Sequence, residues 1–439
     1  MDGLIMAGQL ILGLSILVIL HELGHFLTAR AFGVKVEKFY LFFDAWGVKL
    51  FSFTYKGCEY GVGWLPLGGY VKIAGMIDES MDTEQLAGPP QPWEFRSKPA
   101  WQRLIVMLGG VTVNIILGFF IYWMLIFANG ETFVPNDKLT DGISPGIVGK
   151  EIGLEAGDHI ISLNGEKVKY LDELLSSKIF FGNNELEIER NGQTESIRIP
   201  SNAIELVSDY GLSEFILPRR TLSTIDSVFG GAKQAGVQKG DLLLTVNNKP
   251  ITFHDQLQKE VQNYKGKQVD ITIARQGDTI AMKPVVNNSG LMGLSPSYLP
   301  IPTEHIDYSL AAAFPVGVAK AWGGFIDNAK GLGKVVSGDV KANKAFTGPI
   351  GIARMFGATV DWVKFWSLVG LLSMALAFMN LLPIPALDGG HSVFLIVEMI
   401  KGKPLSDKFM ERAQIVGFCI LVTLMIFIFG NDIFKVVTS

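Results

Sequence analysis

Two histidines and a glutamate, His21, Glu22 and His25, form the sequence HELGH inside an apolar stretch that begins at Leu4 and continues past Phe32. On a helix this spacing places the two imidazoles one turn apart on the same face, with a carboxylate beside them. Such a set is half of a zinc site with its own general base. Ionisable groups are costly inside a membrane-spanning helix. The placement therefore favours a metal site over a pair of hydrogen-bonded core histidines.

The third metal ligand is expected from another element at the same depth, because a catalytic zinc ion has three protein ligands and one open position. Asp388 is the candidate, since it follows Asn380, Pro383 and Pro385 in an apolar segment and precedes two glycines. His391 is close enough to support the site, or to have only a structural role. The other histidines are expected on the surface of the extramembrane region or just after it: His159, His254 and His305.

These residue types predict hydrolytic chemistry. Zinc lowers the pKa of a bound water to about 7, and Glu22 would take a proton from that water and pass it to a leaving amine. Asn380 has an amide that both donates and accepts hydrogen bonds, so it would hold the backbone of a substrate. A structural hydrogen bond within its own broken segment is an equal alternative for Asn380.

The composition predicts a membrane protein with a substantial soluble portion. The chain has 439 residues, of which 49% are hydrophobic and 18% charged, and its mean hydropathy is +0.32. The net charge of −4 and the lack of a basic stripe argue against a nucleic-acid partner. Cys58 and Cys419 lie far apart, so neither a disulfide nor a cysteine metal site is expected. The first residues lack the basic region of a cleavable signal peptide.

Four segments are long and apolar enough to span a bilayer: residues 4–31, 101–128, 363–400 and 412–429. The third should be discontinuous, because proline and glycine interrupt it and non-helical backbone at this depth must line a cavity. Lysine and arginine are frequent in residues 30–103 and 401–412, which predicts that both connections face the cytoplasm. Both termini and the central region would then be periplasmic.

The central region contains an internal repeat. Residues 152–165 and 235–248 share glycine, Gly-Asp and asparagine in one register, which indicates a turn, a short apolar strand and a second turn. In each copy a helix is expected next, near residues 171–179 and 253–264, and then a strand. The repeat resembles tandem PDZ domains of bacterial envelope proteases, here over residues 130–215 and 216–290. Generic α+β modules that share a turn are the alternative.

Two further segments flank this repeat. Residues 61–76 are rich in glycine and alternate in polarity, which predicts a β-hairpin or loop near the membrane surface that pairs with an extended substrate. An ordinary cytoplasmic loop is the alternative. Residues 310–336 have a helical apolar stripe interrupted by charges, which favours an interfacial amphipathic helix. A core helix packed on the second PDZ-like unit is the other interpretation.

The predicted fold class is therefore a multi-pass α-helical membrane protein with four transmembrane helices and two inserted extramembrane PDZ-like α+β domains. The chain is expected to divide into five parts. They are the first two membrane helices with HELGH and the cytoplasmic β-loop (1–129), the two PDZ-like domains (130–215 and 216–290), the interfacial helix with its linker (291–360), and the last two membrane helices (361–439).

HELGH, the NxxPxPxLDGG sequence at residues 380–390 and the paired repeats together resemble the site-2 protease family, of the regulator of sigma-E protease type. The resemblance covers essentially the whole chain and implies an intramembrane zinc metalloprotease in a bacterial inner membrane, with its active site toward the cytoplasmic side. It implies one zinc ion bound by His21, His25 and Asp388, with Glu22 as the base. The residues expected at the substrate cleft are Asn380, Pro383, Pro385, Gly68, Gly69 and Tyr70.

The resemblance also implies partners. The substrates would be single-span membrane proteins already trimmed outside the membrane, such as an anti-sigma factor, and remnant signal peptides. The PDZ pair would filter substrates by size or read a peptide carboxyl terminus. One departure is visible, because Gly110-Val111-Thr112-Val113-Asn114 stands where the family often has Gly-Pro-x-x-Asn. That departure leaves Asn114 in place and puts only the local helix geometry in doubt.

Two other classes of function compete with this interpretation. A membrane-tethered PDZ scaffold or quality-control adaptor would keep a non-catalytic metal site. All four candidate residues remain, which argues against a degenerate site. A metal transporter would show repeated membrane halves, whereas the repeat here lies in the extramembrane region.

Overall fold

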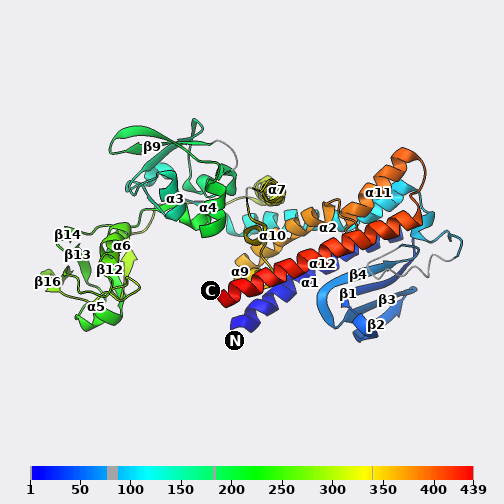
Figure 1. Ribbon diagram of the computed structural model, residues 1–439, viewed down its shortest axis with the longest axis horizontal. Helices are drawn as coiled ribbons and strands as arrows, with labels where there is room; N and C mark the ends of the chain where they lie inside the picture. The colour runs from blue at the N-terminus through cyan, green and yellow to red at the C-terminus, as the bar shows by residue number, and fades with distance from the viewer. Residues whose placement is uncertain (1, 77–87, 181–183, 339, 439) are drawn as a thin grey trace. The chain divides into compact units, whose positions relative to one another are not determined.

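The computed structural model describes residues 2–76, 88–180, 184–338 and 340–438. The chain forms two compact units, one of residues 1–130 with 307–439 and one of residues 131–306. Figure 1 colours the chain from its amino to its carboxyl terminus. We call the first the membrane unit and the second the inserted unit, and each is described by itself.

Among its described residues, the membrane unit has four helices that are long and apolar enough to cross a membrane. They are α1 (Asp2–Ala31), α2 (Ala100–Asn129), α10 (Trp362–Leu381) and α12 (Asp407–Thr438). The expectation of four membrane-spanning helices is therefore confirmed. Shorter helices in this unit are α8 (Ala342–Ala345), α9 (Pro349–Phe356) and α11 (Asp388–Lys401).

Helix α10 ends at Leu381, and α11 begins only at Asp388. Two backbone features allow residues 382–387 to pack closely against the end of α10 and the start of α11. A Cβ atom on Gly389 would lie 2.5 Å from the Leu381 carbonyl oxygen, so only glycine permits this approach. Ala386 has a φ of 83°, a left-handed conformation that costs a residue with a Cβ roughly 1–2 kcal/mol. The break is thus a specific backbone fold that sets where Asp388 lies.

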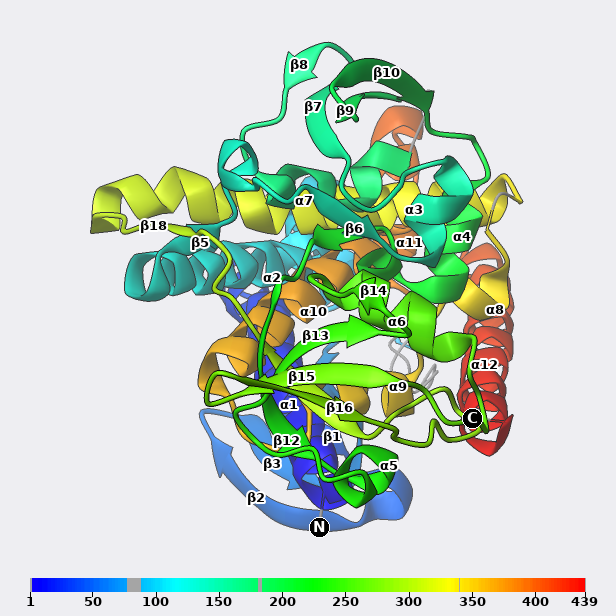
Figure 2. The same cartoon turned by 90° about the vertical axis from the view of Figure 1, so that its left-hand side faces the viewer.

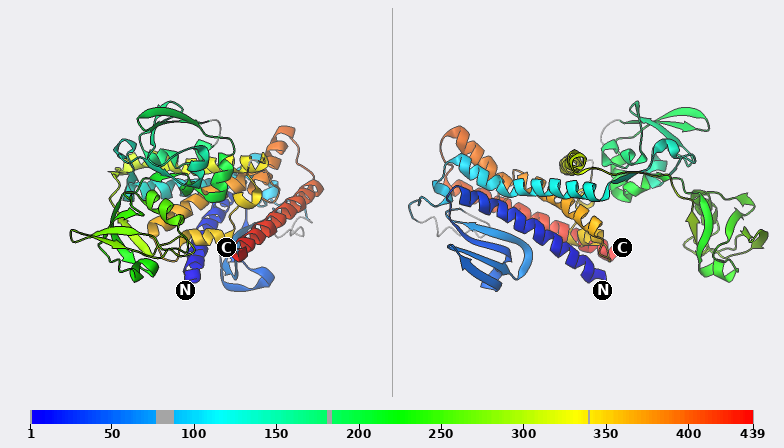
Figure 3. Two further views of the ribbon diagram at one scale, coloured as in Figure 1. Left: turned by 60° about the vertical axis from the view of Figure 1, so that its left-hand side comes forward. Right: turned by 180° about the vertical axis from the view of Figure 1, so that it is seen from behind.

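Helices α1 and α2 run alongside each other, as Figure 3 shows. They touch at a pair of glycines. A Cβ on Gly109 would lie 2.6 Å from the Gly24 carbonyl oxygen, so the two backbones are in direct contact. Small residues at such crossings are what brings membrane helices close together. This crossing lies in the same turn of α1 as the HELGH residues.

Helix α7 (Leu310–Val336) packs on α2 and α10 within the membrane unit. Its buried residues recur every four positions, and Gly317 approaches the Trp123 backbone so closely that a Cβ would lie 2.5 Å from the Trp123 nitrogen. Phe325 meets Phe378 of α10 edge to face at 5.6 Å. Within the membrane unit, the packing partners of α7 are therefore α2 and α10.

A four-stranded sheet follows α1, with the order β2-β3-β1-β4. Its strands are β1 (Val36–Phe43), β2 (Lys49–Tyr55), β3 (Cys58–Gly63) and β4 (Leu65–Ile73). Strand β1 pairs in parallel with β3 and antiparallel with β4. The hairpin predicted for residues 61–76 is wrong, because β1 lies between its two strands. Strand β4 is an edge strand, and it packs on α1.

The inserted unit contains two sheets of the same design, both labelled in Figure 2. The first has the order β10-β9-β7-β8 and the second β14-β13-β15-β16. The first sheet comprises β7 (His159–Leu163), β8 (Glu166–Lys167), β9 (Glu185–Arg190) and β10 (Gln193–Arg198). The second comprises β13 (Leu242–Val246), β14 (Lys249–Pro250), β15 (Ile271–Arg275) and β16 (Asp278–Met282).

Short pairs of strands, α-helices and several 3-10 helices make up the rest of the inserted unit in its described ranges. The paired strands are β5 (Glu131–Phe133) with β18 (Glu304–Ile306), β6 (Ile143–Pro145) with β11 (Ile216–Pro218), and β12 (Leu222–Val228) with β17 (Leu294–Tyr298). The α-helices are α3 (Ile147–Ile152), α4 (Ala203–Tyr210), α5 (Gly230–Gln234) and α6 (His254–Gln262). Because β17 pairs with β12, the second repeat extends beyond residue 290.

The same buried ion pair recurs in both repeats. Arg190 binds both oxygens of Asp158, at 2.8 and 2.7 Å, and Arg275 does the same to Asp241, at 2.7 and 2.8 Å. Each arginine also donates to the carbonyl oxygen of a helix-ending glycine, Gly153 or Gly236, five residues before the aspartate. The Gly-Asp sequence repeat is thus a repeat of one structural interaction.

Replacing Asp241 by Asn should destabilise the second repeat by about 3–5 kcal/mol, because the Asp241 side chain is 1% exposed and its loss leaves Arg275 partly buried without its carboxylate. The Arg275 guanidinium lowers the pKa of Asp241 below its ordinary value. The stability that the pair contributes is therefore present above about pH 4, where an unfolded carboxyl ionises, and is lost as the pH falls through the lower folded pKa. Thermal unfolding of both proteins at pH 7 and at lower pH measures this. A difference that stays constant down to pH 2 would contradict it.

Candidate metal centre

The HELGH residues lie where α1 crosses α2. His21 and His25 are one helical turn apart, and their rings meet edge to face with centroids 4.9 Å apart. Their exposed fractions are only 8% and 6%. An unpaired imidazole at such a buried position is unfavourable, so each ring nitrogen should have a partner.

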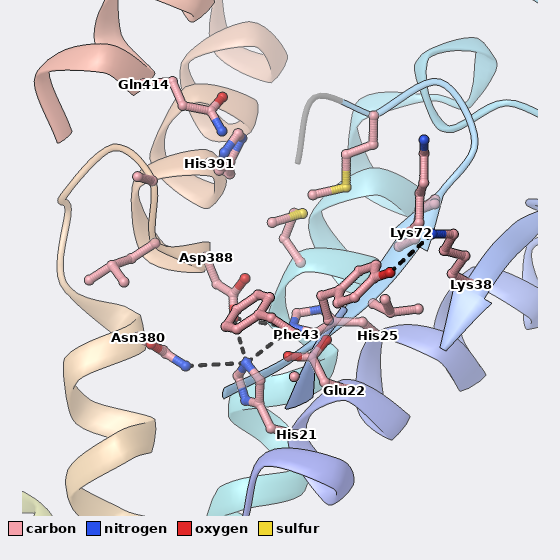
Figure 4. Close-up of a pocket in the computed structure, with 18 of the residues that line it drawn as sticks. His21, Glu22, His25, Lys38, Phe43, Lys72, Asn380, Asp388, His391 and Gln414 are labelled. Carbon is pink, nitrogen blue, oxygen red and sulfur yellow. Dashed lines mark hydrogen bonds and ion pairs between the residues drawn. The ribbon is translucent and has the colours of Figure 1, made fainter. Parts of the chain in front are cut away.

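Asp388, the first residue of α11, completes the group. Its Oδ2 atom lies 3.3 Å from Nε2 of His21 and 3.2 Å from Nε2 of His25, and the two Nε2 atoms are 3.3 Å apart. Figure 4 shows the three side chains pointing toward one another from α1 and α11. Within the described ranges this is the group whose spacing fits a metal ion, with one ligand atom from each residue.

The three atoms fit zinc. Ligands at about 2.0–2.1 Å from a tetrahedral ion are separated by about 3.3 Å, which is the spacing found here. Oδ2 of Asp388 is buried and accepts no hydrogen bond from any described residue. Two imidazoles and a carboxylate form a common ligand set of catalytic zinc sites.

Helix α2 contacts both imidazole rings through its backbone and through one side chain. Nδ1 of His25 lies 2.8 Å from the Val106 carbonyl oxygen, and Nδ1 of His21 lies 3.1 Å from the Asn114 amide. Gly110 stands between these two residues, and any Cβ there would overlap Nε2 of His25 and Cε1 of His21. One face of α2 thus contacts both rings on the side away from Asp388.

Glu22 lies beside the group on the wall of a cavity of about 560 Å³. Its Cγ atom lies against edge strand β4, 3.7 Å from where a Cβ on Gly69 would stand. Gly69 of the same strand allows this approach, because a Cβ there would lie 2.8 Å from Val18 Cγ1 on α1. The candidate base, the candidate ligands and a strand edge therefore share one cavity.

The cavity contains some of the predicted cleft residues. Asn380, Gly69 and Tyr70 line it, whereas Gly68, Pro383 and Pro385 are not among the lining residues in the described ranges. The Asn380 amide nitrogen lies 3.2 Å from Nε2 of His21, so Asn380 stands at the open side of the ligand group.

The Tyr70 ring is held rigidly. It stacks on Phe43 at 6.0 Å and on Tyr40 at 5.4 Å, and its hydroxyl donates to Asp44 at 2.8 Å. Lys38 also reaches Asp44, at 3.1 Å. The cavity wall formed by β1 and β4 is therefore fixed by stacking and by a charged hydrogen-bond network.

Sequence reasoning missed several residues that line the cavity. Lys38 and Lys72 come from the sheet, and Asp44 directly follows β1. Gln414 comes from α12 and lies near His391 in Figure 4. Gln414 is 5% exposed. A polar amide in an apolar span is a usable sequence signal, and it would have pointed to Gln414. Lys38 and Asp44 carried no such signal, because the pairing of β1 with β4 was not predicted.

Comparison with known proteins agrees with this geometry. The model of peptidase family M50 matches residues 9–424. The chain belongs to peptidase family M50. As a member of this family it is a zinc metalloprotease with membrane-spanning helices.

Individual M50 relatives are similar over nearly their full length. The regulator of sigma E protease of Haemophilus influenzae is 30% identical over 452 residues, which cover 98% of each chain. The regulator of sigma-E protease RseP of Escherichia coli is 30% identical over 448 residues, covering 96% of this chain and 97% of the relative. Protease RseP of Yersinia pestis is 30% identical over 456 residues, with the same coverage.

Replacing Gly110 by Ala should weaken zinc binding at least about tenfold, because the new methyl group displaces both imidazoles. Metal analysis of the purified protein after dialysis against a weak chelator measures the loss. Gly8→Ala on α1 is the matched control, since a Cβ at residue 8 meets nothing within 4 Å. Full zinc retention by Gly110→Ala would show that the rings do not depend on this contact.

Proposed function

We propose that this M50 protease is an intramembrane endopeptidase that cuts transmembrane segments of single-span proteins already trimmed outside the membrane. The observation that carries the proposal is the joint placement of the ligand group, Glu22 and the edge of β4 around one cavity. The ligand group lies on α1, a helix apolar enough to span a membrane.

His21, His25 and Asp388 would hold the ion. When bound, zinc supplies a Lewis acid for the scissile carbonyl and lowers the pKa of water. Glu22 accepts a proton from the attacking water and delivers it to the leaving amine. Strand β4 packs against Glu22 at Gly69, so the carboxylate stays at the wall of the cavity. Asn380 lies at the open side of the group and would hold the substrate backbone.

A helical substrate hides its peptide bonds, so it must unwind before it can be cut. Strand β4 is the edge of its sheet and lines the cavity through Leu65 and residues 69–73. An extended segment added to that edge gains backbone hydrogen bonds that replace those of its helix. Glu22 lies against this edge at Gly69, which places the base beside the path of the extended segment.

The membrane arrangement follows from the same proposal. Helices α10 and α11 together form the broken third span, with Asp388 at the break, and the sheet β1–β4 faces the cytoplasm with the active site. Both termini and the inserted unit are periplasmic, in agreement with the excess of lysine and arginine in residues 30–103 and 401–412. The host membrane is a bacterial inner membrane.

The names of the relatives direct the choice of substrate. The relatives in Escherichia coli and Haemophilus influenzae each carry the name regulator of sigma-E protease. We infer that this chain cuts a membrane-bound anti-sigma factor and remnant signal peptides, and that its two repeats are PDZ-like domains that filter substrates or bind a peptide carboxyl terminus. The scaffold alternative is disfavoured, because it gives no role to Glu22 in the cavity.

Replacing Glu22 by Gln should lower the cleavage rate by about 10²–10⁴-fold, because the amide cannot accept the proton of the attacking water. Zinc content should remain that of wild type, since Glu22 is not in the ligand group. Cleavage of a pre-trimmed single-span reporter in detergent and zinc analysis of the same preparations test both parts. Equal cleavage by the two proteins would remove Glu22 as the base. Zinc binding without cleavage of any reporter by wild type would favour the scaffold.

Replacing Gly69 by Ala should reduce cleavage by up to about 100-fold while zinc is retained. The added Cβ would lie 2.7 Å from the Tyr40 carbonyl oxygen and 2.8 Å from Val18, so β4 must move away from α1. A displacement of about 1 Å at a substrate-positioning element is enough for such a loss. The same reporter assay measures the rate, and an unchanged rate would argue against pairing of the substrate with β4.

A further inference from the structure

We propose that Asn114 is a positioning residue for the metal centre: its amide fixes the tautomer and ring orientation of His21, so that Nε2 presents its lone pair to the ion. The inference rests on the proposed ligand set of His21, His25 and Asp388. It adds a residue on α2 that touches neither the ion nor the substrate and acts through an imidazole.

The contact is direct and fully buried. The Asn114 amide lies 3.1 Å from Nδ1 of His21, and Asn114 is 0% exposed. The opposite ring nitrogen, Nε2, faces Asp388 at 3.3 Å. The His21 ring is therefore held between an amide on one side and the ligand group on the other, and the amide determines which nitrogen carries the proton.

The hydrogen bond of His25 shows which tautomer an imidazole of the ligand group has. Its Nδ1 lies 2.8 Å from the Val106 carbonyl oxygen, which can only accept a hydrogen bond. Nδ1 of His25 must therefore carry the proton, and its Nε2 lone pair is free for a metal. The two imidazoles are neighbours in one ligand group, so His21 needs the same tautomer and hence an acceptor at its own Nδ1.

The Asn114 amide can supply that acceptor. As placed, its nitrogen faces His21, and its Oδ1 is buried without a hydrogen-bond partner among the described residues. A rotation of 180° about the last side-chain bond exchanges the two atoms with little change in shape. Oδ1 then accepts the proton on Nδ1 of His21, just as the Val106 carbonyl does for His25.

The spacing on α2 explains why a side chain is used at this position. Val106, Gly110 and Asn114 are four residues apart and share one face of the helix. At Val106 the helix backbone itself reaches His25, Gly110 makes room for both rings, and one turn further only a side chain reaches His21. A hydrocarbon side chain of similar size fills the space but offers no acceptor.

The test uses the full-length protein in detergent, stripped of metal and titrated with zinc against a chromophoric chelator. Asn114→Leu should raise the dissociation constant for zinc by about 10–100-fold. Asn114→Asp keeps an acceptor oxygen and should stay within a few-fold of wild type. With cobalt in place of zinc, the visible absorption bands should change in Asn114→Leu and remain close to wild type in Asn114→Asp.

Ser373→Ala is the matched control. The Ser373 hydroxyl donates to the Asn114 backbone carbonyl at 2.8 Å and is also fully buried, so its loss disturbs the same residue without touching His21. It should keep wild-type zinc affinity. The proposal fails if Asn114→Leu binds zinc as tightly as wild type, or if Ser373→Ala and Asn114→Asp lose as much affinity as Asn114→Leu. Failure of wild type to bind zinc would instead overturn the metal centre itself.

Discussion

The direct backbone contact between α1 and α2 is the constraint on which the site depends. Gly24 and Gly109 let the helices touch, and Gly110 then leaves space for two imidazole rings against the α2 backbone. At an ordinary helix separation of 8–10 Å, neither the Val106 carbonyl nor the Asn114 amide would reach a histidine on α1. The geometry of the ligand group is therefore determined first by helix packing and only then by the ligands.

The same contact offsets the cost of burying polar groups at membrane depth. Each ligand atom is unfavourable alone in an apolar environment, but here each imidazole has a partner on both nitrogens. Asp388 is brought in by the break between α10 and α11, where Gly389 and Ala386 permit a backbone that continuous helix would not allow. If this break lies at membrane depth, as we propose, its non-helical backbone is tolerated because it is packed against protein and lines a cavity.

The ligand group was predictable from the sequence because its signals are local. HELGH requires only helical periodicity, and the proline and glycine pattern before and after Asp388 shows where a helix must break. The repeat was also detected, since Asp158 and Asp241 occupy equivalent turns. The sheet was not predicted, because β1 pairs with β3 and β4 through contacts that no short sequence window contains. Asn114 was noticed as part of a family pattern, but its contact with His21 required the helix crossing.

Strand β4 belongs to a sheet whose strand pairs were not visible in any short stretch of sequence, and its free edge lines the cavity that contains Glu22 and the candidate ligands. A strand edge has free hydrogen-bonding groups and stabilises an added extended segment, whereas a helical segment in a bilayer satisfies its own backbone. The free-energy cost of unwinding a helical segment is offset when hydrogen bonds to the β4 edge replace those that the helix loses. Glu22 lies against this same edge, since a Cβ on Gly69 would be 3.7 Å from its Cγ atom. Under the proposed mechanism, the stretch of substrate that pairs with β4 would therefore also pass the base. Unwinding and proton transfer would then be confined to one position along the substrate.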